Sequence, residues 1–397
     1  METRQRLLLS NAIAAARRAP FWRDRLAADS LPITDKAAWR EAPETDRRTI
    51  APPRGARTVY TSGTTGDRIE VLYPPRGAWF QGVLQLRMSH HQGLFPWDRS
   101  ASVEVRRAVE GHGFAGLVRD RLLVPVPADA PISEVLRIIG RARPKAIVGH
   151  SQVLIEMGEK LAYRYKPAVI ITHGDTLTID HRAMLRDLFG VDPIDIYGTT
   201  ECGVVGWQCR HADLYHVNHE AVAVEIVDEE CTTVPKGETG QLLLTSLWNP
   251  LMPFVRYSIG DSAAWSTRPC RCGSRLPALT HVTGRYFDWI VDVNGRRVAP
   301  HSLLLGLSLG PRVKGVARYC VRQDSVGRVR VDVVPSEHGF SADDANLVRA
   351  SYLGVLGDLD VEVRTVDRIE TAPGVKFETF SSEVKTWTRG EGPEPKA

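Results

Sequence analysis

The sequence predicts an α/β protein. A large N-terminal domain combines doubly wound sheets with a β-rich subdomain, and a small α+β C-terminal domain follows. Two observations predict this class. Between about 146 and 197, short β-branched runs alternate with helical patterns. After Tyr215 the chain changes to short, turn-bounded strands, and from about Val313 to two strands, a helix and a strand. The first pattern is typical of a parallel sheet and the second of an α+β unit.

The parallel region is predicted from three successive units. Runs rich in valine and isoleucine at 146–149 and 168–172 predict buried strands. Between them, apolar residues recur at helical spacing over 151–164. A second helix over 182–189 leads into a strand at 193–197. Strand, helix and strand in this order predict a doubly wound sheet.

The N-terminal part is predicted to contain two helices and a short strand. The first helix, within 1–19, is read as a packing helix, although an arginine-containing transit peptide has a similar pattern. The second helix starts near 31–36, with Thr34 or Asp35 as N-cap. A strand at 59–61 then runs into a glycine-rich loop.

The C-terminal half is predicted to be rich in strands. The β-rich subdomain has strands at 221–227, 240–245 and 289–291. The α+β domain has strands at 317–321, 328–334 and 361–366 around a helix at 342–356. A break near Gly284-Arg285 divides the chain into a domain of residues 1–284 and a mobile domain of residues 285–397.

Composition excludes several classes of function. The 397 residues are 43% hydrophobic and 25% charged, with a net charge of +4, and the basic residues form no stripe of the kind that binds nucleic acid. No apolar run approaches the length of a membrane span. Six cysteines do not make a disulfide framework, so we expect a cytoplasmic protein. The sequence leaves open whether the protein forms a homodimer.

A loop of small and hydroxyl residues is the first candidate binding element. Backbone N–H groups and hydroxyls in such a loop can hold phosphate oxygens, and glycine permits close approach. The spacing is not that of a Walker loop, and a plain polar turn is the alternative. The candidate residues are Ser62, Gly63, Thr64, Thr65 and Gly66.

A second candidate element follows a predicted buried strand. Tyr197 lies at the carboxyl end of that strand, where doubly wound folds bind ligands, and its ring can stack on a purine. Glu201 can hold Mg²⁺ through its carboxylate oxygens. The alternative is that 199–201 starts a helix and that the glutamate favours its N-terminus. The candidate residues are Tyr197, Gly198, Thr199, Thr200 and Glu201.

Two isolated charged residues complete a nucleotide site. Asp261 follows Gly260 at the end of an apolar run, where a carboxylate can bind vicinal ribose hydroxyls. Arg285 follows Gly284 and can reach the ribose or a phosphate. Taken singly, each is more often a turn aspartate or a surface arginine.

Cysteines and a histidine form a candidate zinc site. Cys270 and Cys272 lie on one glycine-containing turn, and Cys209 and His216 come from another segment. Three thiolates and an imidazole are a tetrahedral zinc set. His211 competes with His216, and buried cytosolic thiols are the alternative. The remaining cysteines, which are Cys202, Cys231 and Cys320, are read as ordinary thiols.

Four segments contain the nucleotide-site candidates: 61–67, 197–201, 256–261 and 284–288. In their order and spacing they resemble the phenylacetate–CoA ligase-like branch of the adenylate-forming superfamily. Some members of this branch carry a similar structural zinc site. The resemblance implies that the 62–66 loop grips the β- and γ-phosphates, although Asp67 stands where a lysine is usual. It also implies that Lys376 in the segment 374–377 is catalytic, together with Glu201 and Thr200; an exposed lysine is the alternative. The family's hinge falls at Phe287 or Asp288.

The resemblance implies ATP-dependent activation of a carboxylic acid as an acyl-adenylate, followed by transfer to a thiol, most often coenzyme A. An aryl or arylalkyl acid is the usual substrate of the branch, and the segment 173–175 is expected near the acid pocket, although His173 could equally be a core histidine. Transfer to a carrier protein or an amine is one alternative. A non-catalytic nucleotide-binding descendant is another. The sequence leaves the acid, the acceptor and the pathway open.

Overall fold

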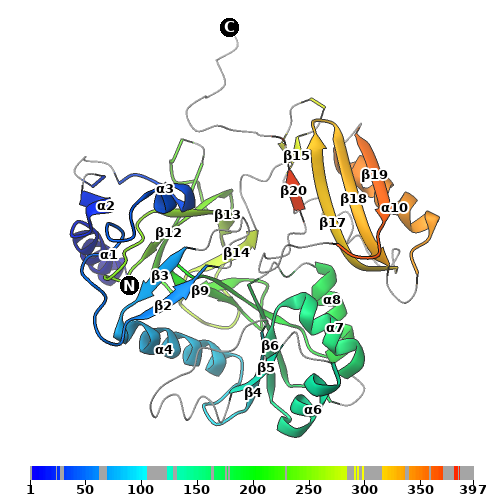
Figure 1. The fold of residues 1–397 in the computed structure, drawn as a ribbon, viewed down its shortest axis with the longest axis horizontal. Helices are drawn as coiled ribbons and strands as arrows, with labels where there is room; N and C mark the ends of the chain where they lie inside the picture. The colour runs from blue at the N-terminus through cyan, green and yellow to red at the C-terminus, as the bar shows by residue number, and fades with distance from the viewer. Residues whose placement is uncertain are drawn as a thin grey trace. The chain divides into compact units, whose positions relative to one another are not determined.

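The computed structural model describes most of the chain in two compact units, each of which is described by itself (Figure 1). Among the described residues, those up to 283 belong to the first unit and those from 290 to the second. The residues described are 2–23, 25–26, 31–61, 69–104, 123–127, 132–161, 165–174, 177, 179–228, 230–283, 290–291, 293–294, 297–298, 315–335, 339–356, 359–369, 380–382 and 384.

The first unit begins with three helices and a short strand. These are α1 (Glu2–Ala16), α2 (Pro20–Arg23), β1 (Thr34–Asp35) and α3 (Lys36–Glu41). Asp35 caps α3, because its carboxylate accepts the backbone N–H of Ala38 at 2.9 Å. Trp22 and Trp39 are fully buried, and the Trp22 indole donates to the carbonyl of Pro253. The predicted N-cap and N-terminal packing helix are therefore present.

One twelve-stranded sheet forms the frame of the first unit. Its parallel half, in spatial order, contains β5 (Leu123–Pro127), β4 (Ser100–Glu104), β6 (Ala146–Gly149), β7 (Val169–His173) and β8 (Ile194–Thr199). Its antiparallel half continues with β9 (Gly203–Gln208), β10 (Tyr215–Val217), β14 (Ala278–Thr283), β13 (Tyr257–Trp265), β12 (Thr239–Ser246) and β11 (Val222–Val227). The N-terminal β1 pairs with β13 in parallel. The direction therefore changes between β8 and β9.

Helices cover both faces of the parallel half (Figure 1). On one face, α6 (Ile132–Ala142), α7 (Ser151–Leu161) and α8 (Ile179–Phe189) share a buried cluster with Ile147 and Ile170. On the other, Met88 of α4 (Pro75–His91) packs with Val169 and Ile171. Alternate residues of one strand thus enter opposite cores, which explains its continuous apolar run. The predicted doubly wound α/β region is confirmed.

The described part of the second unit is a four-stranded sheet with one helix. Its strands lie in the order β19 (Asp360–Thr365), β18 (Arg328–Pro335), β17 (Val316–Ser325) and β20 (Phe380–Ser382). The helix α10 (Ala342–Leu356) buries Val348 and Tyr352 against this sheet. Two strand pairs stand apart from both sheets: β2 (Arg57–Tyr60) with β3 (Glu70–Tyr73), and β15 (Ile290–Val291) with β16 (Arg297–Val298). Among the described residues, no helix is long and apolar enough to cross a membrane.

Candidate active site

The segment that carries Tyr197 ends the last parallel strand of the sheet. After β8 the chain turns at 200–202 and returns as β9, so the alternative of a helix starting at 199–201 is wrong. The turn is tight, because a Cβ on Gly198 would lie 2.9 Å from the carbonyl oxygen of Gly203. The Thr199 hydroxyl accepts the backbone N–H of Cys202 at 2.9 Å. Glycine at 198 therefore lets two antiparallel backbones approach closely.

Asp261 lies inside β13, not at the end of a strand as predicted from the apolar run. The pairing with β12 explains this difference. Gln241 stands opposite Ser262, whereas Leu243 stands opposite Ser258, so residues 259–261 face a single residue of the partner strand. Gly260 at the centre of this bulge has φ of +90°. A β-bulge changes the direction of the side chains that it contains, and Asp261 is one of the residues of this bulge.

Two tyrosine–carboxylate hydrogen bonds join these segments reciprocally. The Tyr197 hydroxyl donates to Oδ2 of Asp261 at 2.7 Å. The Tyr257 hydroxyl donates to Oε1 of Glu201 at 3.2 Å. Tyr197 stands four residues before Glu201, which is bonded by Tyr257. Tyr257 in turn stands four residues before Asp261, which is bonded by Tyr197. The Tyr73 hydroxyl adds a bond of 2.8 Å to the backbone carbonyl of Thr200. The two carboxyl groups are therefore held in fixed positions before any ligand binds.

Burial dominates the electrostatics of this group. Only 6% of Glu201 is exposed. Burial raises the pKa of the Glu201 carboxyl, and the hydrogen bond from Tyr257 opposes the shift only in part. Burial and the neighbouring Asp261 raise the pKa of Tyr197 well above its ordinary value. The phenol therefore stays protonated and remains a donor.

Several predicted site residues lie outside the described residues. These are the phosphate-loop residues Ser62, Gly63, Thr64, Thr65 and Gly66, together with Arg285, Phe287, Asp288 and Lys376. Their roles stay predictions. The described part of the predicted nucleotide site is the segment 197–201 with Asp261.

A second group of side chains collects cysteine and histidine donors. His91, Cys209, His216 and Cys272 each offer one donor atom, and these four atoms lie within 4.8 Å of one another. Nε2 of His91 lies 3.5 Å from Sγ of Cys209, and Nε2 of His216 lies 3.3 Å from Sγ of Cys272. Sulfur and nitrogen ligands of a tetrahedral zinc are about 3.6 Å apart, given its usual bond lengths. The spacing of these donors suits such an ion.

The backbone around both thiols also suits a metal centre. Sγ of Cys209 accepts the backbone N–H of His211, and Sγ of Cys272 that of Ser274, each at 3.4 Å. Both donors stand two residues after their cysteine and would favour a thiolate. His216 is fully buried, and its Nε2 faces Sγ of Cys272. Burial and the neighbouring His91 lower the pKa of His216 to about 4, so its imidazole is neutral, as a metal ligand must be.

The structure brings together most of the predicted metal ligands and adds one. Cys209, His216 and Cys272 belong to the group, and the competing His211 is exposed. Cys270, the fourth predicted ligand, is outside the group of four, although its thiol contacts that of Cys209. Burial is the main cause that raises the pKa of Cys209 to about 12, and the neighbouring thiols of Cys270 and Cys272 add to the shift. The addition is His91 at the end of α4. Its only sequence signal was a pair of histidines before a Gln-Gly turn.

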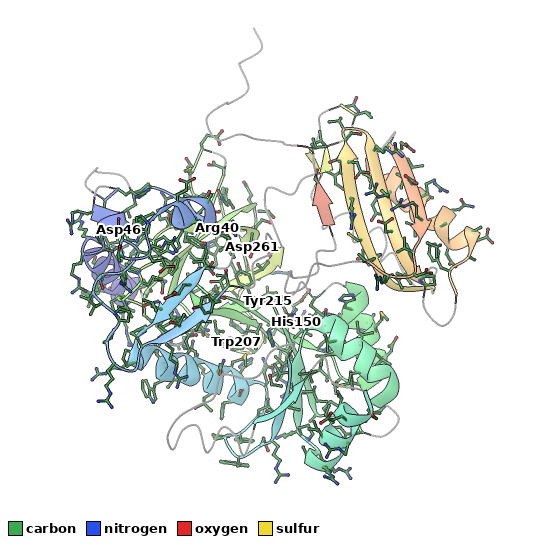
Figure 2. The ribbon with its side chains drawn as sticks, in the orientation of Figure 1. Arg40, Asp46, His150, Trp207, Tyr215 and Asp261 are labelled. Carbon is green, nitrogen blue, oxygen red and sulfur yellow. The ribbon has the colours of Figure 1, made fainter. Side chains whose placement is uncertain are left out.

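Trp207, which is labelled in Figure 2, packs against both histidines of this group. Its ring centroid lies 4.6 Å from that of His91 and 4.8 Å from that of His216. Trp207 is opposite His216 in the β9–β10 pair, and only 1% of it is exposed. The aromatic ring thus fixes both imidazoles and excludes water from one side of the group.

Beside the metal group, a buried aspartate ties the strands together. Asp195 of β8 accepts the Tyr215 hydroxyl at 2.7 Å and the Thr172 hydroxyl at 2.8 Å. Its backbone N–H donates to the Gln208 side chain, which also accepts from Arg182. This network links β7, β8 and β10 at the point where the sheet changes direction.

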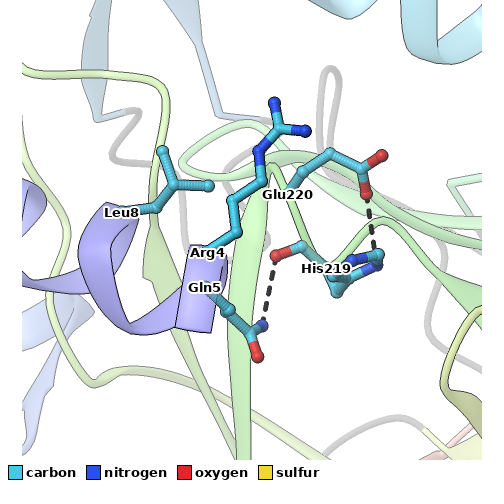
Figure 3. Close-up of a pocket in the computed structure, with 5 residues that line it drawn as sticks. All are labelled: Arg4, Gln5, Leu8, His219 and Glu220. Atoms are coloured by element: carbon cyan, nitrogen blue, oxygen red, sulfur yellow. Dashed lines mark hydrogen bonds and ion pairs between the residues drawn. The ribbon is translucent and has the colours of Figure 1, made fainter. Parts of the chain in front are cut away.

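A surface pocket of about 380 Å³ lies elsewhere, against α1 (Figure 3). Arg4, Gln5, Leu8, His219 and Glu220 line it. Its polar groups bond to one another: Gln5 donates to the His219 carbonyl at 3.1 Å, and the His219 ring lies 3.3 Å from the Glu220 carboxylate. It contains no predicted site residue, so we assign it no part in the chemistry.

Comparison with known proteins gives one curated relative. No protein-family model matches the sequence. Over 147 residues the chain is 26% identical to a phenylacetate–coenzyme A ligase of Thermus thermophilus, which corresponds to 36% of this chain and 33% of that protein. The match thus spans about a third of the length of the relative.

Solved structures share the fold over nearly the whole chain. A 2-hydroxyisobutyryl-CoA ligase in the postadenylation state, in complex with 2-HIB-AMP, superposes with a TM-score of 0.78 at 17% identity, covering 97% of this chain and 90% of that one. An anthranilate CoA ligase in complex with anthranoyl-AMP gives 0.60 at 16% identity, over 80% and 64% of the two chains. The chain therefore shares its fold with these ligases, and about a third of it is similar in sequence to a phenylacetate–coenzyme A ligase.

Proposed function

We propose that the protein is an AMP-forming acid–thiol ligase. An oxygen of a carboxylic acid attacks the α-phosphorus of ATP, the bond to the bridging oxygen breaks, and pyrophosphate leaves. The sulfur of a thiol then attacks the acyl carbon of the adenylate, and AMP leaves. The observation that carries this proposal is the reciprocal tyrosine–carboxylate pair, which holds Asp261 and Glu201 beside the carboxyl end of β8.

The nucleotide roles follow from the position of each group. Asp261 binds the ribose hydroxyls, and its hydrogen bond from Tyr197 fixes the carboxylate for this contact. The Tyr197 ring packs against the purine. The 62–66 loop holds the terminal phosphates, and Arg285 binds the ribose or a phosphate. The protein contributes position and charge neutralisation, which are the main requirements of nucleotidyl transfer.

The buried carboxyl group of Glu201 is chemically suited to bind a magnesium ion. A buried carboxyl with a raised pKa gains when a cation replaces its proton, because the cation stabilises the charged form that burial disfavours. Bound there, the ion supplies charge neutralisation for the phosphates. The Tyr257 hydroxyl keeps the carboxylate oriented, and Thr200 is fixed through its backbone by Tyr73.

Zinc fits the group of His91, Cys209, His216 and Cys272, with Cys270 as an alternative thiolate. The donor set is the usual one for a structural site, and no open position for substrate is needed there. We assign the ion a structural role, joining α4, β10 and the loop before β14.

The substrates are assigned by class. The acid is a small carboxylic acid, and both solved relatives named above hold an acyl-AMP of a small acid. An aryl or arylalkyl acid remains the first choice, because the curated relative is a phenylacetate ligase. Coenzyme A is the first choice of thiol, and a carrier protein or an amine is the alternative. We place the enzyme in the cytoplasm, and a homodimer remains to be tested.

Lys376 is proposed to neutralise charge as the α-phosphate is attacked. Lys376→Ala is expected to slow the adenylation half-reaction by about 100-fold or more. Thioester formation from a supplied acyl-adenylate should change by less than about 3-fold, since that step forms no bond to phosphorus. Single-turnover measurements of both half-reactions would show the split, with the exposed Lys236→Ala as control. Equal loss in both halves would remove Lys376 from this role.

The first experiment is ATP–pyrophosphate exchange with a panel of aryl, arylalkyl, hydroxy, fatty and amino acids. Acid-dependent exchange would establish adenylation and narrow the acid in one step. Its absence across the panel, with ATP binding demonstrated by calorimetry, would instead favour the non-catalytic nucleotide-binding alternative.

A further inference from the structure

The helix α4 carries an exposed apolar stripe along the outside of the first unit (Figure 1). Trp79, Val83 and Leu86 belong to it, and Trp79 is 71% exposed. With the exposed ring of His90 they recur at spacings of four, three and four residues. These are the spacings of a coiled-coil seam. The opposite side of the helix is already buried through Met88, so the stripe is a second apolar face.

Aromatic rings continue the stripe beyond the end of α4. The ring centroids of His90 and Phe95 are 5.8 Å apart, and those of Phe95 and Trp97 are 5.1 Å apart with the rings nearly parallel. The Asp98 carboxylate accepts the backbone N–H of Phe95 at 2.8 Å and pairs with the Lys145 ammonium at 2.7 Å. These contacts hold the turn in one conformation, so little conformational entropy is lost when a partner covers the rings.

A glycine beside the stripe is the second observation. Gly82 lies near the middle of the 17-residue helix α4, where glycine is less favourable than alanine. A Cβ at Gly82 would meet no described atom within 4 Å. Gly77 of the same helix differs, because a Cβ there would lie 2.5 Å from Cζ3 of Trp248. The space at Gly82 is therefore open next to the stripe, and it resembles the holes that receive side chains of a facing helix.

The stripe is large enough for an interface between two copies of the chain. Its five apolar side chains expose on the order of 500 Å², since one aromatic side chain alone offers about 150 to 250 Å². A patch of this size is among the largest that a monomer exposes. Two copies joined by symmetry would bury about 1,000 Å², the lower limit of a specific interface, before any polar rim is counted. The five side chains are Trp79, Val83, Leu86, Phe95 and Trp97.

The charges near the stripe favour a second copy over an acidic partner or a membrane. Arg87 beside the stripe pairs with Glu220, and Lys145 at its far end pairs with Asp98. Arg76 lies at its other end. Anionic membranes bind helices that are rich in lysine and arginine on their polar face, and acidic partners need a basic surface. An apolar stripe whose neighbouring cations are mostly paired within the chain fits an equally apolar surface.

We propose that the outer face of α4, with the aromatic turn that follows it, joins two copies of this chain in an antiparallel helix pair. A two-fold axis that passes between residues 84 and 85 places Val83 opposite Leu86 of the second copy. The same axis places Trp79 opposite His90 of the second copy, so every position of the seam has a counterpart. The inference does not depend on the proposed chemistry, since the stripe contains no residue of the nucleotide site.

The first test is sedimentation equilibrium of the whole chain at about 1 to 100 µM, because an interface of this area can be as weak as micromolar. We expect a dimer. Val83→Glu and Leu86→Lys each place an unpaired charge in the seam, so each should raise the Kd of the dimer by about 100-fold or more. Gln85→Glu changes an exposed residue of α4 outside the seam and should leave Kd within about 3-fold. Circular dichroism and thermal unfolding would show that each variant is folded.

A mixture of two variants tests the antiparallel register. In this register the carboxylate introduced by Val83→Glu in one chain faces the ammonium introduced by Leu86→Lys in the other. An equimolar mixture should therefore form a heterodimer with a Kd at least about 10-fold lower than that of either variant alone. Gln85→Glu mixed with Leu86→Lys is the matched control, because its carboxylate lies outside the seam and should give no such gain.

The outcomes decide between the possible partners. A wild-type dimer that both charged variants dissociate, together with a heterodimer in their mixture, supports the proposal. A chain that is monomeric at about 100 µM, a dimer that neither variant weakens, or a mixture that stays monomeric overturns it. Monomeric chains that bind phosphatidylcholine vesicles, and lose this binding in Trp79→Ala, would overturn it in favour of a lipid-facing surface.

Discussion

The tyrosine–carboxylate pairs and the cysteine–histidine group are both buried polar clusters, and they differ in how they are satisfied. In the first, each carboxyl accepts a hydroxyl from the opposite segment. In the second, the nitrogen and sulfur atoms face one another across 3.3–3.5 Å, with only weak hydrogen bonds that involve the thiols. Buried polar groups without partners are costly.

The difference indicates what each cluster needs from a ligand. The tyrosine–carboxylate pairs are satisfied within the protein, so the proposed nucleotide would meet a preorganised site. The cysteine–histidine group has the donor set of a structural zinc site, so binding of the proposed ion should contribute to the free energy of folding. Changes in the second cluster should therefore affect stability most, and changes in the first should affect catalysis.

The largest effect is expected from the metal group. Cys272→Ser should reduce zinc from about one ion per chain to none and lower Tm by about 10 °C, because a tightly held ion stabilises the fold by on the order of 3–4 kcal/mol. Elemental analysis and calorimetry would measure both. Cys231→Ser, which changes an exposed cysteine outside the group, is the matched control. A metal-free wild-type protein of unchanged stability would contradict the zinc assignment.

The next effect is expected at Glu201. Glu201→Gln keeps the acceptor for Tyr257 but removes the charge that binds Mg²⁺, so pyrophosphate exchange should fall by about 100-fold. The matched control is Glu238→Gln at an exposed position. Unchanged exchange, with an unchanged dependence on magnesium concentration, would exclude Glu201 as a magnesium ligand.

The same substitution should raise Tm in the absence of added magnesium. Burial raises the pKa of Glu201 in the folded protein, so the free energy of unfolding falls as the pH rises from the ordinary pKa of a glutamate to the raised one, and the full cost applies above it. Glutamine cannot ionise, so the variant should be more stable than wild type at neutral pH. The gain should shrink as the pH falls and vanish below about 4, where the glutamate is protonated in both states. A gain independent of pH would contradict this account.

The smallest effect is expected from removing one hydroxyl of the reciprocal pair. Tyr197→Phe keeps the ring and loses the 2.7 Å bond to Asp261, so KM for ATP should rise about 3- to 10-fold with little change in kcat. Tyr215→Phe loses a bond of the same length, to Asp195, outside the nucleotide site. Tyr215→Phe should lower the free energy of unfolding about as much as Tyr197→Phe does, without changing the KM for ATP. An equal rise in KM in both variants would show that the Tyr197 bond is merely structural.

Sequence patterns predicted the core of the parallel half of the sheet and most of the second unit, but they missed β9, β10, β13 and β14 and the region from 77 to 143. The helix expected over 342–356 coincides with α10, and the strands at 146–149 and 168–172 with β6 and β7 within a residue. The region from 77 to 143 gave no prediction, and α4 lies there. Its outer face carries exposed Trp79, Val83 and Leu86, opposite the inner Leu84 and Met88. Apolar residues on both sides of a helix leave no single apolar stripe to detect.

The sequence by itself predicted the alternating strands and helices, the resemblance to the phenylacetate–CoA ligase-like branch, and most of the chemical groups of the candidate site, because these depend on local spacing and residue type. Only the tertiary structure decided how the groups meet. The bulge that carries Asp261 arises from pairing with β12, and His91 reaches Cys209 across 118 positions of sequence. Such contacts depend on how distant strands and helices pack, which short-range patterns do not encode.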